Sequence, residues 1–282
     1  MLSMLQRWLI YFPTRKREVR VEDASLPAGK VHHISVRTDD GLELHGWHVL
    51  ADGHLATDQE QCDRELQRGR LLVLFFSGNA ANRIYRVEEI RVLTAAGADV
   101  FIFDYRGYAE NAGSPSEAKL VADARVIWKY ATDERNVASD RIVLFGESLG
   151  GGVTTRLAAE RSQMGTPPAG VILRSTFSSL VDVGKYHYPW LPVRILLVDQ
   201  FLSLEHIPKV TCPILQIHGA RDTIVPISLG HKLFESAPET SANGLQRRFV
   251  RLINANHNDV LHVAKTELSR AVSKFLAQLH DW

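Results

Sequence analysis

Residues 146–150 read Gly-Glu-Ser-Leu-Gly, which places Ser148 between two glycines. The preceding residues 141–145 have the length and β-branched content of a buried strand, and residues 153–159 suit a helix, so the serine falls at the turn between them. The glycines remove the Cβ atoms that would collide where strand and helix cross closely, which leaves the serine hydroxyl at the tip of a sharp turn. That geometry suits a nucleophile, although five residues of this pattern also fit an ordinary turn.

A serine nucleophile needs a histidine as its base and a carboxylate that orients the histidine. Asp222 follows the strand-like run PILQIHG (213–219), and His257 follows RRFVRLIN (247–254). The order Ser, Asp, His is the one expected when a single sheet presents all three groups at its strand ends. We therefore predict that Ser148, Asp222 and His257 form a catalytic triad.

Each partner of the serine also has a simpler explanation, and other residues of the same types compete for its role. An aspartate close before a proline can form an Asx turn, and a histidine at a helix start is commonly a cap or a surface residue. His231 and His262 compete as the base but fall within helical stretches, while Asp182 and Asp199 compete as the acid but lie in an apolar stretch. The position at strand ends favours the triad given above.

The loop SGNAAN (77–82) follows another apolar run, LLVLFF (71–76), and is a candidate for an oxyanion site. Its glycine lets the backbone turn, so that the next amides can point at a developing negative charge. We predict that the backbone amides of Asn79 and Leu149 form the oxyanion hole. An ordinary strand-to-helix turn with an asparagine cap is the alternative for this loop.

These groups need a sheet that brings the strand ends together. Residues 31–38 and 42–50 are strand-like and are joined by Asp-Asp-Gly, which predicts an antiparallel hairpin at the start of the fold. Strands that are apolar on both faces and alternate with helices predict a mostly parallel sheet covered by helices on both faces. Sites in such folds form at the carboxyl ends of the strands. The runs that carry this pattern are 71–76, 99–104, 141–146, 170–175, 213–219 and 247–254.

Two segments between these strands have a local signature. The sequence SPSE predicts a helix start with Ser114 as the cap, Pro115 in the first turn and Glu117 reaching back to the cap. Residues 52–69 are polar and charged, which predicts a surface insertion.

Residues 176–208 form a stretch between the strands near 170 and 213 that is rich in aromatic side chains. We predict a small lid there, over an acyl pocket, with ordinary packing of a helical stretch as the alternative. Tyr105, Tyr188 and Trp190 are assigned to the substrate pocket.

Length and composition predict one domain over residues 1–282. Of these residues 45% are hydrophobic, and no Ser/Gly/Pro-rich linker divides the chain. The 33 basic and 32 acidic residues give a formal charge of +1 that is spread along the chain, which argues against a nucleic-acid partner. Cys62 and Cys212 are expected to be free thiols.

No metal or cofactor is expected. His32 and His33 lie on one predicted strand and His45 and His48 on its neighbour, but no cysteine or carboxylate cluster completes a ligand set. The run SLGGG does not match a dinucleotide fingerprint. A small-molecule acyl ester is the expected partner, and the sequence does not determine an oligomeric state.

The N-terminus, MLSMLQRWLIYFPTRKR (1–17), is apolar and aromatic and then basic. Arg7 interrupts it and Pro13 ends it, well short of the ~20 residues that a membrane-spanning helix needs. It also lacks the features of a secretory signal, which favours a cytoplasmic location. Two interpretations stay open: an edge segment that packs on the domain, which we favour, or a peripheral membrane anchor with Trp8, Tyr11 and Phe12 in the headgroup layer.

Taken together, these motifs resemble the α/β-hydrolase-domain-containing group of the α/β-hydrolase superfamily, which includes depalmitoylases and lysophospholipases. The resemblance covers nearly the whole chain and implies an α/β-hydrolase fold. The matching pieces, in the family's order, are LIYFPTR, SGNAAN, FDYRGY, SPSE, FGESLGG, STFSSL, YHYPWLP, CPILQIHGARDTIVP and ANHNDV.

The chain departs from the family pattern at the oxyanion loop, where Ser77 and Ala81 replace a histidine and a glycine, in YAEN (108–111) and at Asn256. The triad and the resemblance together imply a serine carboxylesterase that cleaves short to medium acyl esters through an acyl-enzyme. The alternatives are a membrane-associated acyl-protein thioesterase or lysophospholipase, then a prolyl-type peptidase or a catalytically silent scaffold.

Overall fold

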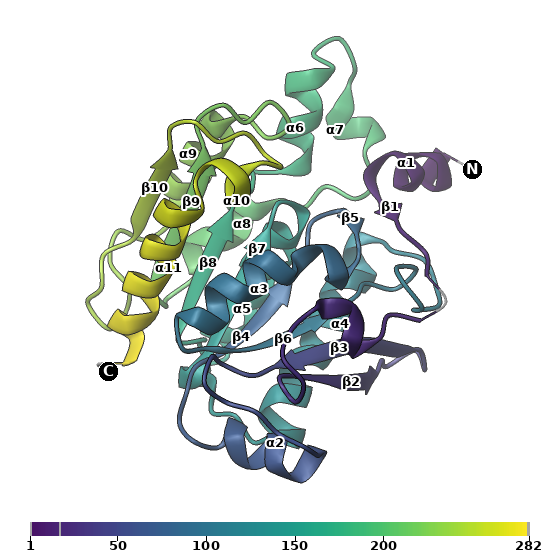
Figure 1. Cartoon of the computed structure of the whole chain (residues 1–282). Helices are drawn as coiled ribbons and strands as arrows, with labels where there is room; N and C mark the ends of the chain where they lie inside the picture. The colour runs from purple at the N-terminus through teal and green to yellow at the C-terminus, as the bar shows by residue number, and fades with distance from the viewer. Residues whose placement is uncertain (1, 17, 281–282) are drawn as a thin grey trace.

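The computed structural model describes residues 2–16 and 18–280 and has an eight-stranded sheet at its centre (Figure 1). The strand order is β10-β9-β8-β7-β4-β6-β3-β2. Strand β3 pairs antiparallel with β2 and β6, whereas the neighbouring pairs from β6 to β10 are parallel. The predicted hairpin and mostly parallel sheet are therefore confirmed. The strands are β2 (Val31–Arg37), β3 (Glu43–Val49), β4 (Leu72–Phe76), β6 (Asp99–Phe103), β7 (Ile142–Glu147), β8 (Gly170–Arg174), β9 (Ile214–Gly219) and β10 (Arg248–Leu252).

Helices cover both faces of this sheet, as the apolar strands require. Along β4, Leu72, Leu74 and Phe76 pack in one core with side chains of α4 and α5, while Val73 and Phe75 point into the core on the opposite face, with α3 and α11. Side chains alternate in this way because successive residues of a strand point to opposite faces. The covering helices are α3 (Val87–Ala95), α4 (Glu117–Lys129), α5 (Leu149–Gln163) and α11 (Lys265–His280).

Shorter elements connect this framework. They are α1 (Leu2–Ile10), β1 (Phe12–Pro13), η1 (Val21–Ala24), α2 (Gln59–Leu66), β5 (Ala80–Ala81), η2 (Arg83–Arg86), η3 (Tyr130–Glu134), η4 (Ser139–Arg141), α6 (Leu180–His187), α7 (Val193–Leu196), α8 (Ser203–His206), η5 (Ile207–Lys209), α9 (Ile227–Ser236) and α10 (Val260–Val263). No helix of residues 2–16 and 18–280 is both long enough and apolar enough to cross a bilayer.

The start of α4 differs from the prediction. Its cap is Ser116, not Ser114: Ser116 has extended backbone angles, and its hydroxyl accepts a hydrogen bond from the Lys119 amide at 3.4 Å. Glu117 does not reach back to the cap. Its carboxylate instead accepts the backbone amides of Gln200 and Phe201, at 2.7 and 2.9 Å, because the end of the lid segment (residues 176–208) packs against the start of α4.

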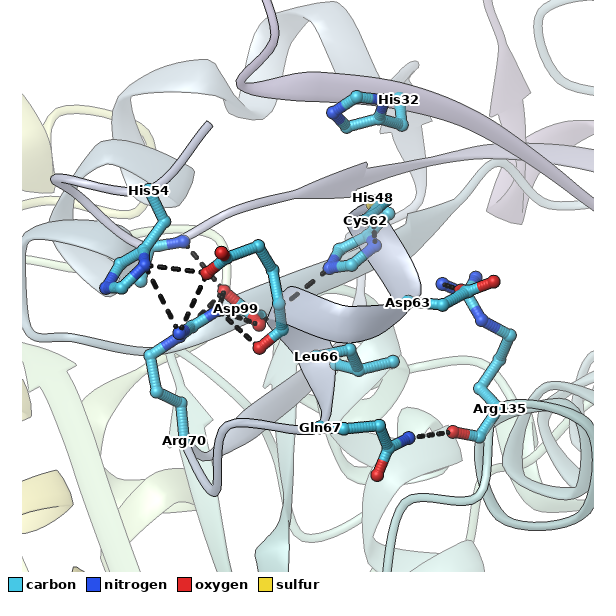
Figure 2. Close-up of polar contacts among 12 residues, drawn as sticks. His32, His48, His54, Cys62, Asp63, Leu66, Gln67, Arg70, Asp99 and Arg135 are labelled. Carbon is cyan, nitrogen blue, oxygen red and sulfur yellow. Dashed lines mark hydrogen bonds and ion pairs between the residues drawn. The ribbon is translucent and has the colours of Figure 1, made fainter. Parts of the chain in front are cut away.

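The polar stretch 52–69 contains α2, one side of which is buried against the sheet. Figure 2 shows the contacts at that side: the Cys62 sulfur lies 2.9 Å from His48 Nδ1, and Arg70 pairs with Asp99 at 3.0 Å. The carboxylate of Asp99 also accepts the Ala51 amide at 2.8 Å. Polar residues outnumber apolar ones in this stretch, but Cys62 attaches it to His48 of β3, and the flanking residues Ala51 and Arg70 bind Asp99 of β6.

Both cysteines are free thiols, as expected, and both are buried. Cys62, His48 and Asp99 follow one another in space, with His48 Nε2 3.9 Å from the carboxylate. This is not a second nucleophilic site, because Cys62 is fully buried and that burial raises the pKa of its thiol to about 12.

Candidate active site

The turn after β7 has the conformation that the sequence predicts for a nucleophile. Ser148 has φ 51° and ψ −115°, and α5 begins at the next residue. A positive φ is strained for a serine. The flanking glycines are required by space: a Cβ on Gly146 would lie 2.6 Å from the Gly151 Cα atom, and a Cβ on Gly150 would overlap the carbonyl oxygen of Phe76. The hydroxyl therefore stands at a close crossing of β7, α5 and β4.

Three loops at the carboxyl end of the sheet bring the predicted triad residues together. The Ser148 hydroxyl lies 3.1 Å from His257 Nε2, and His257 Nδ1 lies 2.7 Å from the Asp222 carboxylate. Each of the three residues is 7% exposed. The three predicted residues are thus connected by two hydrogen bonds in the arrangement that acyl transfer needs.

The carboxylate of Asp222 is held in its charged form. Its second oxygen accepts the amides of Ile224 and Val225, at 3.0 and 2.7 Å. Burial opposes ionisation, but hydrogen bonds from His218, His257 and the Val225 amide outweigh it and hold the pKa of Asp222 below its usual value. The Asx turn that competed with the catalytic interpretation is present, and it serves to orient the carboxylate.

The residues that competed for these roles lie elsewhere. Asp182 binds Ser178 and Lys232, and Asp199 binds Arg7 and Tyr11. The His231 ring stacks on Phe249 at 4.1 Å between centroids, and His262 is exposed on α10.

The predicted oxyanion loop lies beside Ser148. A Cβ built on Gly78 would be 3.6 Å from the Ser148 Cβ, and Leu149 is the first residue of α5, so its amide has no acceptor within the helix. The carbonyl of Asn79 accepts the Phe12 amide at 2.9 Å and the Tyr108 hydroxyl at 2.6 Å. The peptide groups around Asn79 are therefore held from outside the loop.

The sequence reasoning missed a buried ionic cluster directly behind the serine. Glu147 pairs with Arg86 at 2.6 Å and with Arg174 at 2.8 Å, and it accepts the Gly78 amide at 3.4 Å. Burial raises the pKa of this carboxyl, but the two guanidinium groups outweigh burial and lower it to about 2. Arg86 also donates to the Ala80 carbonyl at 3.0 Å, so the cluster joins the elbow to the predicted oxyanion loop.

The three residues assigned to a substrate pocket have different surroundings. Tyr105 is buried, and its hydroxyl donates to the Ser77 carbonyl in the predicted oxyanion loop at 2.8 Å. Burial raises the pKa of Tyr105 well above the usual value. Tyr188 and Trp190 are exposed on the lid segment, with ring centroids 6.4 Å apart. Tyr105 thus contacts the loop that lies beside Ser148, and the pocket role of all three stays a prediction.

A family model of hydrolases matches the middle of the chain. Residues 67–196 match the Hydrolase_4 family model, described as serine aminopeptidase, S33. That segment includes Ser148 and ends before Asp222 and His257.

Two curated relatives and one solved structure illustrate the similarity. The chain is 38% identical over 273 residues to the uncharacterized protein Rv2307c of Mycobacterium tuberculosis, covering 97% of this chain and 88% of that protein. It is 30% identical over 239 residues to lysophosphatidylserine lipase ABHD12 of Danio rerio, covering 78% of this chain and 62% of that protein. The Pyrococcus furiosus esterase Pf2001 superposes with a TM-score of 0.70 at 20% identity, covering 95% of this chain and 97% of that one.

The likeness to the esterase shows the fold, and the long match to the mycobacterial protein shows kinship over nearly the full chain. The strand order, the elbow, the family match and the mycobacterial relative together show that the chain belongs to the α/β-hydrolase superfamily.

Proposed function

We propose that the chain is a serine carboxylesterase that uses Ser148, His257 and Asp222 to cleave short to medium acyl esters. The observation that carries the proposal is the pair of hydrogen bonds from the strained elbow serine through the histidine to the buried carboxylate. No metal or cofactor enters the mechanism.

In this mechanism the Ser148 oxygen attacks the acyl carbon while His257 Nε2 takes the proton of the Ser148 hydroxyl. Asp222 fixes the tautomer of the ring and stabilises its positive charge. The amides of Asn79 and Leu149 donate to the oxyanion, and the protonated ring then gives its proton to the leaving alkoxide. Water then attacks the acyl-enzyme: His257 takes a proton from the water and afterwards returns it to the Ser148 oxygen as the acid leaves. Esters fit because an alkoxide leaves with less help from a general acid than an amine does.

A lysophospholipase or acyl-protein thioesterase is the second candidate. It is supported by exposed aromatic and aliphatic side chains beside the site and by the similarity to a lysophosphatidylserine lipase. A peptidase, in line with the description of the family model, is the third.

A panel of substrates separates these candidates. We expect p-nitrophenyl esters to be hydrolysed with a maximum at short to medium chain length, and Ser148→Ala to abolish the activity. Hydrolysis of palmitoyl thioester or lysophospholipid with little short-chain activity would favour the second candidate, and release of an N-terminal amino acid would favour the third. A protein inactive toward the whole panel would contradict the proposal.

A further inference from the structure

The N-terminal segment and the lid segment form one unit in the structure. Arg7 Nε and the Tyr11 hydroxyl each donate to the buried Asp199 carboxylate at 3.0 Å. The Val198 amide donates to the Gln6 side chain at 3.0 Å, and that side chain also donates to the Leu196 carbonyl. Figure 1 shows α1 and α7 at the same side of the molecule.

This unit contacts the loops of the candidate active site on two sides. At one side, the Asn79 side chain donates to the Ile10 carbonyl at 2.6 Å, and β1 pairs with β5 in the oxyanion loop. At the other side, His187 at the end of α6 contacts the Ile224 carbonyl at 2.8 Å, two residues after the triad aspartate. A surface on this unit therefore borders the site.

Large apolar side chains of both segments are exposed on this unit. Trp8 is 73% exposed, Trp190 75% and Ile195 85%, and none of them forms part of the two large cores of the described residues. We name this the apolar rim, which comprises Trp8, Leu9, Phe12, Tyr186, Tyr188, Trp190, Ile195, Leu196 and Val198. Tryptophan and tyrosine are the side chains that settle at the level of lipid headgroups.

Cations flank the apolar rim in both segments. Residues 1–17 contain four arginines and lysines, of which Arg7 pairs with Asp199 and Lys16 with Asp23. Residues 183–198, the part of the lid segment between Asp182 and Asp199, contain Lys185 and Arg194 and no aspartate or glutamate. Lys185 and Arg194 are exposed, and neither forms an ion pair within the described part of the chain. An apolar surface flanked by cations complements an anionic lipid surface, where acyl segments and headgroup phosphates meet.

We propose that the apolar rim and its flanking cations dock the protein on an anionic lipid surface, with the site facing the lipid. The proposal goes beyond hydrolysis and does not require it, because docking depends on surface side chains alone. It differs from the N-terminal anchor considered from the sequence, since six of the nine side chains of the apolar rim come from the lid segment.

Vesicle flotation tests this with the full-length protein carrying Ser148→Ala, so that no substrate turnover is involved. The vesicles are phosphatidylcholine alone or an equal mixture of phosphatidylcholine and phosphatidylglycerol. We expect the parent to bind the mixed vesicles. Lys185→Gln/Arg194→Gln should lower the affinity for these vesicles about thirtyfold, because each cation near an anionic surface strengthens binding about fivefold. Trp8→Ser/Ile195→Ser should lower that affinity about tenfold or more.

Matched controls lie on other parts of the surface. Leu55→Ser/Met164→Ser removes exposed apolar groups, and Arg270→Gln/Lys274→Gln removes two exposed cations of α11. Both should bind as the parent does. All variants should have the circular dichroism spectrum and melting temperature of the parent.

Three results would overturn the proposal. The first is that the protein does not bind the mixed vesicles. The second is that the rim and cation variants bind them as well as the parent does. The third is a dimer in light scattering that Trp8→Ser/Ile195→Ser separates into monomers, because a second copy of the chain would then cover the rim. None of these experiments measures hydrolysis. A protein that binds the vesicles but shows no hydrolase activity would therefore contradict the proposed function and leave the proposed docking in place.

Discussion

Replacement of Asp222 by asparagine isolates the electrostatic part of the proposed mechanism. The substitution keeps the shape of the side chain and removes a charge that lies 2.7 Å from His257 Nδ1. At an effective dielectric constant of about 20, two opposite unit charges at that separation attract by about 6 kcal/mol. A neutral hydrogen bond to the amide would retain about 1 kcal/mol. The protonated ring formed during acyl transfer would therefore lose about 5 kcal/mol of stabilisation, which corresponds to a loss in rate of about 10³- to 10⁴-fold.

The assay is kcat/KM for a soluble short-chain p-nitrophenyl ester, with thermal melts to show that the variant is folded. Asp182→Asn is the matched control, because Asp182 is also hydrogen-bonded, to Ser178 at 2.6 Å, but binds Lys232 rather than a histidine. We expect the control to remain within a few-fold of the parent. A folded Asp222→Asn that keeps activity within tenfold of the parent, or an equal loss in Asp182→Asn, would refute this assignment of the acid.

Three further predictions concern the support of the site. Folding lowers the pKa of Glu147 from 4.5 to about 2, so its ionic contacts stabilise the fold by about 3 kcal/mol above pH ~4.5, and this stabilisation is lost as the pH falls toward 2. Chemical denaturation at several pH values should show the largest loss of stability in Glu147→Gln, relative to the parent, at neutral pH. A loss of stability at pH 2 equal to that at neutral pH would count against the cluster. Gly150→Ala should destabilise the fold by several kcal/mol in the same assay, because its new Cβ would overlap the Phe76 carbonyl oxygen. Gly78→Ala, whose new Cβ would make ordinary contacts, should destabilise it by less than about 1 kcal/mol. Equal losses of stability in the two variants would show that close packing at Gly150 is not what requires a glycine there. Tyr105→Phe should lower kcat more than it raises KM. About 1 kcal/mol of transition-state stabilisation is lost because the Ser77 carbonyl loses its hydrogen bond. An unchanged kcat would show that this hydrogen bond does not support the oxyanion loop.

The parts of this fold that the sequence predicted are those with a local cause. Apolar runs gave the parallel strands, and the two glycines around Ser148 gave the elbow, because both depend on residues next to one another in the chain. The order of Asp222 and His257 after the serine was informative because parallel strands deliver their following loops to one edge of the sheet. The helix cap failed by two residues, since both Ser114 and Ser116 suit a cap and the packing of α4 decided between them.

The contacts that support the site could not be predicted in the same way. Glu147 reads as an ordinary polar residue of the elbow, and its partners Arg86 and Arg174 are set by tertiary packing of distant segments. The hydroxyl of Tyr105 and the side chain of Asn79 likewise bind backbone atoms whose positions follow only from the complete fold. A charged residue directly beside a nucleophile in an apolar strand is the one signal that could have prompted a search for buried partners.

Covalent labelling of the elbow serine tests directly whether Ser148 is an activated nucleophile. The full-length protein is treated with a fluorophosphonate, which phosphonylates a serine only where a base and an oxyanion site activate it, and the modified peptide is identified by mass spectrometry. We predict one modified residue, Ser148, with labelling abolished in Ser148→Ala and strongly slowed in His257→Ala. Labelling that persists in Ser148→Ala, or a folded parent protein that takes no label, would contradict this prediction.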